Sequence, residues 1–205
     1  MISLDLQEKT FGAQLVLGQM RLWIEPGEVL GLSGASGVGK STLLRILAGL
    51  DLRFSGRLDA PQNRAMVFQS PTLMPWRRVI DNITIPTQCR PEVAEAMLER
   101  VGLEGKARVW PGQLSLGQAR RVAIARAFVG RPELLILDEP FASLDRERVQ
   151  ELIVLTGALI AETRPAVIFA SHSEEELAAL STRRLHLEGR PARLVQPEAR
   201  LRVGS

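Results

Sequence analysis

The sequence predicts an α/β fold: helices around a mostly parallel sheet, with an N-terminal antiparallel β-subdomain and an inserted α-helical subdomain. Three observations predict it. A glycine-rich turn at residues 34–41 lies between an apolar run and a helical pattern. Three later apolar runs of four or five residues are typical of strands covered on both faces. Between residues 70 and 113 five prolines interrupt the chain, which indicates a segment of different architecture.

The length and composition favour a single domain. A chain of 205 residues is long enough for one well-buried domain and too short for two full-sized catalytic halves, so we expect one domain over 1–205. The net charge of +3 comes from scattered arginines, which predicts a solvated surface and no nucleic-acid partner. No apolar run approaches the roughly 18–20 residues of a membrane span and no secretory segment is present, so we expect a cytoplasmic protein.

The first 33 residues have the alternation of antiparallel strands. Apolar and polar side chains alternate in 2–6 and 19–24, and a shorter apolar run occupies 15–17. The turn Glu25-Pro26-Gly27 precedes a strand that we expect from Glu28 to Ser33.

The stretch Gly34-Ala35-Ser36-Gly37-Val38-Gly39-Lys40-Ser41 predicts a phosphate-binding loop. Its glycines permit backbone conformations in which successive N–H groups face the phosphates of a nucleotide, and the helix that follows adds its positive N-terminal dipole. Lys40 would reach the β- and γ-phosphates, and the Ser41 hydroxyl would ligate Mg²⁺. We therefore expect nucleotide contacts from Gly34, Ser36, Gly37, Gly39, Lys40, Ser41 and Thr42.

The helix after the loop carries leucines on one face and is expected to end near Gly49. These leucines are Leu43, Leu44, Leu47 and Leu50. A polar connection then leads to a buried strand at 65–68 that ends at Gln69. The proline-rich segment that follows contains one clear helix, from Pro91 to about Val101, with an apolar stripe that begins at Val93. We expect the helical subdomain to cover about residues 70–130.

The α/β rhythm returns after this segment. Ser115 is a suitable N-cap for a helix through Phe128, in which Arg120, Arg121 and Arg126 are expected to point outward or to a ligand edge. Buried strands are expected at 134–137 and 166–170, an amphipathic helix between them, and a closing hairpin at 185–190.

Three buried strands end on polar residues, and in an open parallel sheet such ends face the ligand. Gln69, Asp138, Glu139 and His172 should therefore gather beside the phosphate loop. Asp138 would hold a metal directly or through water, and Glu139 would act as the general base on the attacking water. Gln69 could contact both the metal and that water, and His172 the γ-phosphate. The alternative interpretations are two acids that merely cap a strand end and a structural histidine.

The stretch Leu114-Ser115-Leu116-Gly117-Gln118 resembles the signature motif of ATP-binding cassette (ABC) ATPases, usually Leu-Ser-Gly-Gly-Gln. The order of the family's motifs is matched along nearly the whole chain, which implies a P-loop NTPase core with ATP and Mg²⁺ as cofactors. The resemblance places Phe11 at the adenine-stacking position, Gln69 in the Q-loop, 134–139 as Walker B, Asp145 in the D-loop and His172 as the switch histidine. An edge-strand or core role for Phe11 remains the alternative.

In ABC ATPases two cassettes pair head to tail, and the signature serine and glycine of one contact the γ-phosphate held by the other. The resemblance therefore implies that Ser115, Gly117 and Gln118 complete a site in a second cassette, either an identical copy or a paralogue. Leu116 departs from the motif, because leucine lacks the conformational freedom of glycine and places a bulky group near the dimer seam. We expect slower hydrolysis, not its loss.

The segment 73–83, with Pro75-Trp76 before Asp81-Asn82, resembles importer cassettes of the nitrate/sulfonate/taurine group. The resemblance implies membrane permease subunits, a periplasmic or extracellular substrate-binding protein, and a location on the inner face of a bacterial cell membrane. Trp76 is then either an anchor for the permease or part of the subdomain core. The alternatives are a cassette of an exporter or maturation system and a non-transport ABC ATPase acting on nucleic acid. A P-loop kinase or GTPase would leave the signature stretch unexplained.

Overall fold

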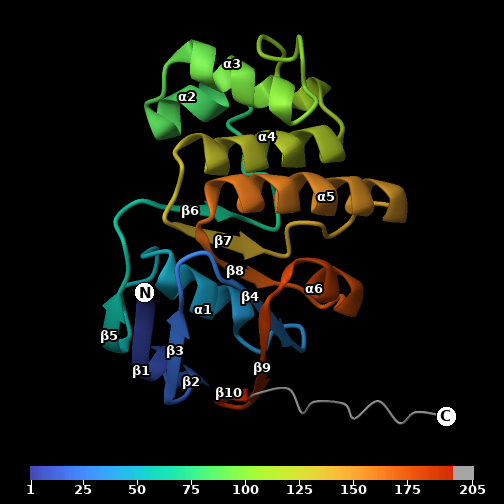
Figure 1. The fold of residues 1–205 in the computed structure, drawn as a ribbon. Helices are drawn as coiled ribbons and strands as arrows, with labels where there is room; N and C mark the ends of the chain where they lie inside the picture. The colour runs from blue at the N-terminus through green and yellow to red at the C-terminus, as the bar shows by residue number, and fades with distance from the viewer. Residues whose placement is uncertain (196–205) are drawn as a thin grey trace, which may run out of the picture.

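The computed structural model describes residues 1–195, so the last ten residues of the predicted domain lie outside the described residues. One sheet has the strand order β3-β1-β2-β10-β9-β4-β8-β7-β6, and β5 pairs with β1 beside this path. Figure 1 shows the helices stacked above and below the central strands, with the N-terminal strands at the lower left.

The centre of the sheet is parallel, as predicted. It consists of β9 (Arg183–Gly189), β4 (Val29–Gly34), β8 (Ala166–Ala170), β7 (Leu134–Asp138) and β6 (Arg64–Val67). All four pairings between them are parallel. In register, Val67 lies opposite Leu137 and Asp138 opposite Ala170, so the strands end at one edge. The polar residues that follow them are thereby brought to the same side.

The N-terminal strands form the predicted antiparallel subdomain. They are β1 (Ile2–Phe11), β2 (Gln14–Leu17) and β3 (Met20–Ile24), and β10 (Ala192–Val195) forms a hairpin with β9. The expected polar connection before residue 65 is wrong in part, because β5 (Ser55–Asp59) pairs antiparallel with β1. This strand is mostly exposed, so it lacks the apolar pattern by which a strand is predicted.

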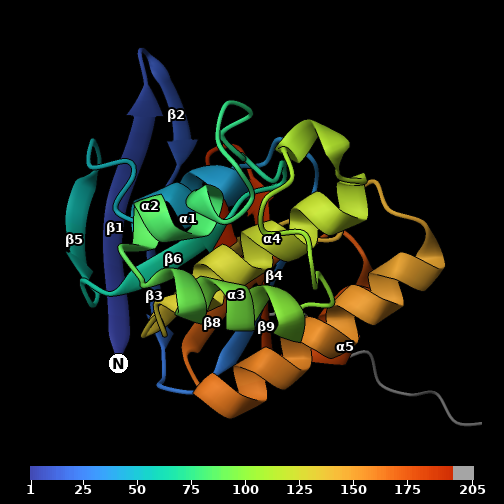
Figure 2. The ribbon, with the colours of Figure 1, turned by 90° about the horizontal axis from the view of Figure 1, so that it is seen from above.

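Helices cover both faces of the parallel strands (Figure 1). Seen from above, α3 and α4 lie over the sheet, with β1, β3 and β5 to one side (Figure 2). The sequence had not indicated α2, which contains Pro86, or the short α6. The helices are α1 (Lys40–Leu47), α2 (Asp81–Thr87), α3 (Pro91–Arg100), α4 (Leu116–Val129), α5 (Arg146–Thr163) and α6 (Glu174–Leu180), with a 3₁₀ turn at Pro111–Gln113.

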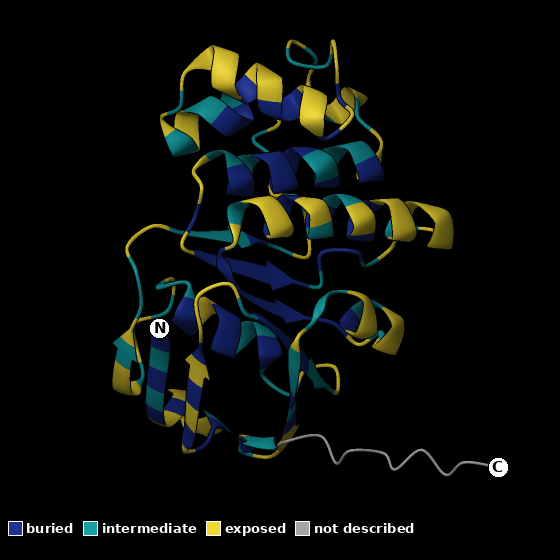
Figure 3. Ribbon diagram, viewed as in Figure 1, coloured by how far each residue is buried: buried dark blue, intermediate teal, exposed yellow. Residues whose placement is uncertain are grey.

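Two apolar clusters are separated by the sheet. In β7, Leu135 and Leu137 belong to the cluster with α2–α5, whereas Leu134 and Ile136 belong to the cluster with α1 and the N-terminal strands. This alternation follows from the two-residue period of a strand. Figure 3 shows the result, buried central strands and exposed outer faces of α3 and α5. Among residues 1–195, no helix is both long and apolar enough to cross a bilayer.

Three side chains lie differently from expectation. Leu50 is exposed because α1 ends at Leu47, before the helical face reaches it. Val93 is exposed on the outer side of α3. Arg120, expected to point outward or to a ligand edge, is 4% exposed and lies inside the protein.

Candidate nucleotide-binding and catalytic site

The phosphate loop has the backbone that only glycine adopts without strain. Gly39 has a φ of +121°, and a Cβ atom there would lie 2.7 Å from Leu17 Cδ2. At Gly34 a Cβ atom would lie 2.6 Å from the carbonyl oxygen of Leu187. Ser36 and Gly37 are exposed at the tip of the loop, and Thr42 is half-buried in the first turn of α1. At its glycines the loop can therefore bring its backbone close to a ligand, beside the side chains of Lys40 and Ser41.

Lys40 begins α1 and points back across the loop. Its side chain is 5% exposed, and Nζ donates to the carbonyl oxygens of Gly34 (2.8 Å) and Ala35 (3.2 Å). Nζ also lies 3.7 Å from Glu139 Oε1. The ammonium is thus held beside Glu139, where a nucleotide phosphate could replace these contacts.

Ser41 and Asp138 offer the oxygen ligands that Mg²⁺ prefers. The Ser41 hydroxyl donates to Asp138 Oδ1 at 3.0 Å. The pKa of Asp138 lies above its ordinary value because the carboxyl group is buried. The hydrogen bond from Ser41 offsets only part of this increase. Within residues 1–195 no group of three or more His, Cys, Asp or Glu side chains could hold a metal. This donor set fits Mg²⁺, which commonly uses one or two carboxylates together with substrate phosphates.

Two of the predicted strand-end residues, Gln69 and His172, lie beside a third, Glu139. Gln69 Nε2 donates to Glu139 Oε2 at 3.3 Å, and His172 Nδ1 lies 3.7 Å from the same oxygen. Glu139 has a φ of +47°, the left-handed region that a non-glycine residue adopts at a cost of about 1–3 kcal/mol. The amide of Gln69, the imidazole of His172 and the ammonium of Lys40 thus all lie beside the carboxylate of Glu139.

The signature residues form the N-terminus of α4. Ser115 is the N-cap: its Oγ accepts from the N–H of Gln118 (3.2 Å), and Gln118 Oε1 accepts from the N–H of Ser115 (3.0 Å). The capping hydroxyl still has its own proton to donate to a phosphate. Gly117 is buried but a Cβ there would meet nothing nearer than 3.7 Å, so packing within this chain does not require glycine.

Asp145 lies at the start of α5. Its carboxylate caps the helix by accepting from the N–H of Arg148 at 3.0 Å, and it also pairs with the Arg148 guanidinium at 3.2 Å. Arg148 in turn lies beside the signature helix: a Cβ atom added to Gly117 would have Arg148 Cδ as its nearest neighbour, at 3.7 Å. The D-loop residue Asp145 is therefore next to the signature helix.

Phe11 ends β1 with a ring that is 53% exposed, so it is not a core residue. Lys9, which sequence reasoning missed, is 2% exposed and places Nζ 4.5 Å from the centre of that ring. Lys9 Nζ is held at 2.7 Å by Asp51 and by the carbonyl oxygen of Arg53. Irregular register in β1 turns Lys9 inward, and no local sequence signal reveals such a shift. An ammonium on one ring face leaves the other available for stacking.

The comparisons with known proteins identify the family. The sequence model of one family, described as ABC transporter, matches residues 17–142 of this chain. The chain belongs to the ABC transporter family. Aliphatic sulfonates import ATP-binding protein SsuB 2 of Paracoccus denitrificans is 45% identical over 177 residues, which cover 85% of this chain and 72% of that protein. SsuB 1 of Pseudomonas fluorescens is 46% identical over 200 residues, 92% of this chain and 76% of that protein.

Solved structures agree with this assignment. A dimeric post-hydrolysis state of the ATP-binding cassette MJ0796 bound to ADP and Pi has a TM-score of 0.82 and 26% identity, over 96% of this chain and 98% of that chain. A second MJ0796 structure, a dimeric bacterial ABC transporter cassette, has a TM-score of 0.78 and 27% identity and covers 91% and 94% of the two chains. The predicted family and fold are therefore confirmed.

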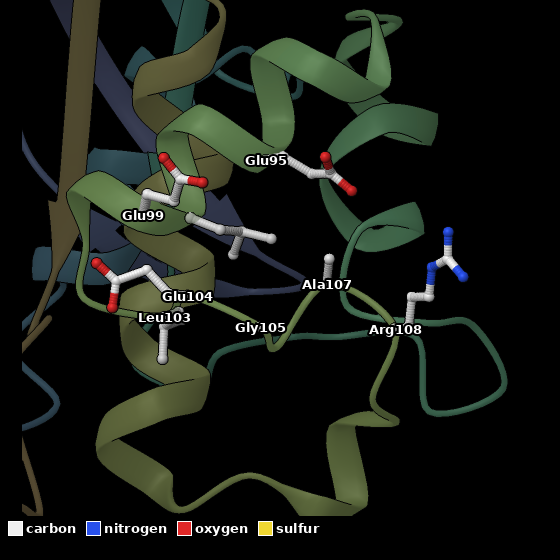
Figure 4. Close-up of a pocket in the computed structure, with 8 residues that line it drawn as sticks. Glu95, Glu99, Leu103, Glu104, Gly105, Ala107 and Arg108 are labelled. Carbon is white, nitrogen blue, oxygen red and sulfur yellow. The ribbon is translucent and has the colours of Figure 1, made fainter.

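A hollow of about 300 Å³ lies elsewhere in the cassette, between α3 and the loop that follows it (Figure 4). Three carboxylates, of Glu95, Glu99 and Glu104, and one guanidinium, of Arg108, line it. This surplus of negative charge is unfavourable for a phosphate group, so the hollow is not a candidate nucleotide site.

Replacing Leu116 with glycine is expected to raise the kcat of ATP hydrolysis by about two- to fivefold, equivalent to roughly 1 kcal/mol or less. Leu116 is the first residue of α4 and has no positive φ, so the freedom of glycine is not needed here. Its side chain is 43% exposed at the signature end, so we expect its bulk, rather than its backbone, to slow closure of the site. Steady-state phosphate release measures kcat, with Leu116→Ala as an intermediate; an unchanged rate in both variants would contradict this reason.

Replacing Phe11 with alanine is expected to weaken ATP binding by about 5- to 150-fold, because stacking on a base contributes roughly 1–3 kcal/mol. Titration calorimetry with ATP measures the affinity. Phe11→Tyr is the matched control, since it keeps the ring over Lys9 and should bind like the parent. Equal affinities for the alanine variant and the parent would assign Phe11 to the edge strand alone.

Proposed function

We propose that this cassette hydrolyses ATP at a site completed by a second cassette and thereby drives import through a membrane permease. The observation that carries the catalytic part is the convergence of Gln69, His172 and Lys40 on the carboxylate of Glu139. This convergence supports hydrolysis because phosphoryl transfer needs positive charge, an oriented nucleophile and a positioned base at one place.

In the proposed reaction the loop N–H groups and Lys40 bind the β- and γ-phosphates. Glu139 accepts the proton of the attacking water, Gln69 orients that water, and His172 contacts the γ-phosphate. Ser41 and Asp138 would hold Mg²⁺, with Gln69 as a further contact, and the ion would neutralise phosphate charge. Nucleotide phosphates would draw Lys40 Nζ away from its present carbonyl partners and so release the loop for binding.

The second cassette is an identical copy or a paralogue. Ser115 and Leu116 are exposed at the N-terminus of a 14-residue helix whose dipole favours an anion. Across the seam, Ser115, Gly117 and Gln118 would contact the partner's ATP, and Asp145 would lie beside it. The dimeric MJ0796 cassettes, one with ADP and Pi, support this arrangement.

The permease would dock on the segment around Trp76. Trp76 is 71% exposed, which excludes a place in the subdomain core. Asn82 is fully buried and holds the segment with its amide, accepting from the N–H of Met74 at 2.6 Å and donating to the carbonyl oxygens of Met74 and Arg78. A rigidly held, exposed tryptophan is a typical interface anchor. We propose one domain over 1–205, with this segment in a helical subdomain of about 70–130.

The names of the relatives support a proposal for the cargo. Proteins 45–46% identical are named as aliphatic sulfonates import ATP-binding proteins, so we propose a sulfonate-type organic anion delivered by a periplasmic or extracellular substrate-binding protein. The cassette would then lie at the cytoplasmic face of the bacterial cell membrane.

Coexpression with the candidate permease tests the proposal. The two should copurify, and in proteoliposomes ATP hydrolysis should rise when binding protein loaded with an alkanesulfonate is added on the opposite side. The same assay with nitrate- or taurine-loaded binding protein distinguishes the members of the substrate group.

Trp76→Ala should reduce copurification while the isolated cassette still binds ATP. Copurification with an exporter subunit, or salt-sensitive binding to DNA, would contradict the import role.

A further inference from the structure

Two arginines of α4 hold the chain segments that directly follow two catalytic strand ends. We infer that Arg120 and Arg126 are positioning residues, through which α4 fixes Glu139 and Gln69 against each other for hydrolysis. The inference rests on the proposed roles of Glu139 and Gln69 and adds the element that sets their geometry.

Arg120 clamps the turn after Glu139. Its Nη1 donates to the carbonyl oxygen of Pro140 at 2.6 Å, and its Nη2 donates to that of Ala142. Two residues of this turn adopt the left-handed backbone conformation, Glu139 at φ +47° and Ser143 at φ +64°. Such conformations persist only when surrounding contacts over-determine them. The fork of one guanidinium supplies two of these contacts, which a lysine ammonium with its single nitrogen cannot reproduce in the same plane.

Burying the charged guanidinium of Arg120 has a free-energy cost. The side chain is buried, and both of its hydrogen bonds go to main-chain carbonyls rather than to a carboxylate. Its buried Nε donates to no partner within residues 1–195. Burial lowers the pKa of Arg120, which reports the cost of removing this charge from water. An apolar side chain would avoid that cost, so a geometric role explains the arginine better than stability does.

Arg126 makes the equivalent contacts on the Gln69 side. Its Nη1 donates to the carbonyl oxygen of Thr72, and its Nη2 donates to that of Pro71 and to Thr72 Oγ1, each at 3.1 Å. Thr72 is itself left-handed, at φ +49°. Burial lowers the pKa of Arg126 as well. The segment after Gln69 is thus held in the same manner as the turn after Glu139.

One helix, α4, therefore carries both arginines. Residues 120 and 126 are separated by about 9 Å along the axis of α4, and the two segments that they hold follow the neighbouring parallel strands β6 and β7. Between those segments, Gln69 Nε2 contacts Glu139 Oε2. Because α4 begins at the signature residues, one helix carries the signature end and both arginines.

The test compares Arg120→Lys with Arg121→Lys. Arg121 lies next to it on α4 and also makes two contacts, to the carbonyl oxygen of Val101 (3.1 Å) and to Glu151 (2.6 Å), away from the site. We expect Arg120→Lys to lower kcat about tenfold or more with the KM for ATP within about twofold, while Arg121→Lys keeps the parental kcat. Arg126→Lys, at a less buried position, should give the same split and serves if Arg120→Lys does not fold.

A second readout separates positioning from general damage. In a Glu139→Gln background, Arg120→Lys should still form the ATP-bound dimer on gel filtration, because the clamp acts on the base and not on ATP binding. Parental kcat in both clamp variants, or an equal loss in Arg121→Lys, overturns the inference. Glu139→Gln alone is measured in parallel: if it keeps full hydrolysis, the proposed base is wrong, whereas an inactive Glu139→Gln beside a fully active Arg120→Lys and Arg126→Lys refutes only the clamp.

Discussion

Replacing Glu139 with glutamine is expected to slow ATP hydrolysis by about 10²- to 10⁴-fold, the usual contribution of a positioned general base. Glutamine has nearly the same shape and can keep the contact with Gln69, but it cannot accept a proton from water. ATP affinity should stay within about threefold, since the proposed phosphate contacts come from the loop and Lys40. Single-turnover hydrolysis and equilibrium binding measure the two effects separately, and ATP should hold the variant as a dimer.

Glu133→Gln is the matched control for this variant. Glu133 is exposed and directly precedes β7, at the opposite end of the strand from Glu139. The same loss of one negative charge there should leave kcat unchanged. Full hydrolysis by Glu139→Gln, or an equal loss in both variants, would refute Glu139 as the base.

Replacing Lys40 with alanine is expected to weaken ATP binding by about 10²-fold or more, because two charge-assisted hydrogen bonds to phosphates are lost, each contributing about 1.5–3 kcal/mol. The loop also loses the contacts by which Lys40 joins the carbonyl oxygens of Gly34 and Ala35. Titration calorimetry with ATP measures the loss, and circular dichroism verifies that the variant is folded.

Lys106→Ala is the control for the charge change. The chain has three lysines, at 9, 40 and 106, and Lys106 lies outside the phosphate site in the loop after α3. Its replacement should leave the affinity within about twofold. A folded Lys40→Ala variant with parental affinity would place the phosphates away from this loop.

Sequence patterns predicted which side chains gather at the end of the parallel strands, because strand patterns depend on neighbouring residues. The runs 134–137 and 166–170 are apolar at every position, as strands covered on both faces must be, and each is followed by polar residues. The parallel register then brings Gln69, Glu139 and His172 together without further information. Ser115 was likewise predictable as an N-cap, because capping depends on neighbours in the sequence.

The residues missed depend on contacts between distant segments. Arg120 looks like any exposed helical arginine until the turn at 140–142 covers it. Lys9 is turned inward by irregular register in β1, where strict alternation predicts an outward side chain. The strand β5 exists because it pairs with β1, and its own residues are too polar to predict it.

The burial of two of the three lysines has a practical consequence. Lys9 and Lys40 are 2% and 5% exposed and engaged in hydrogen bonds, whereas Lys106 is half-buried at the surface of the helical subdomain. An amine-reactive fluorophore should therefore attach chiefly at Lys106 and the amino terminus. A dye at Lys106 would report, in real time and without engineered cysteines, whether the surroundings of this loop change when nucleotide is added.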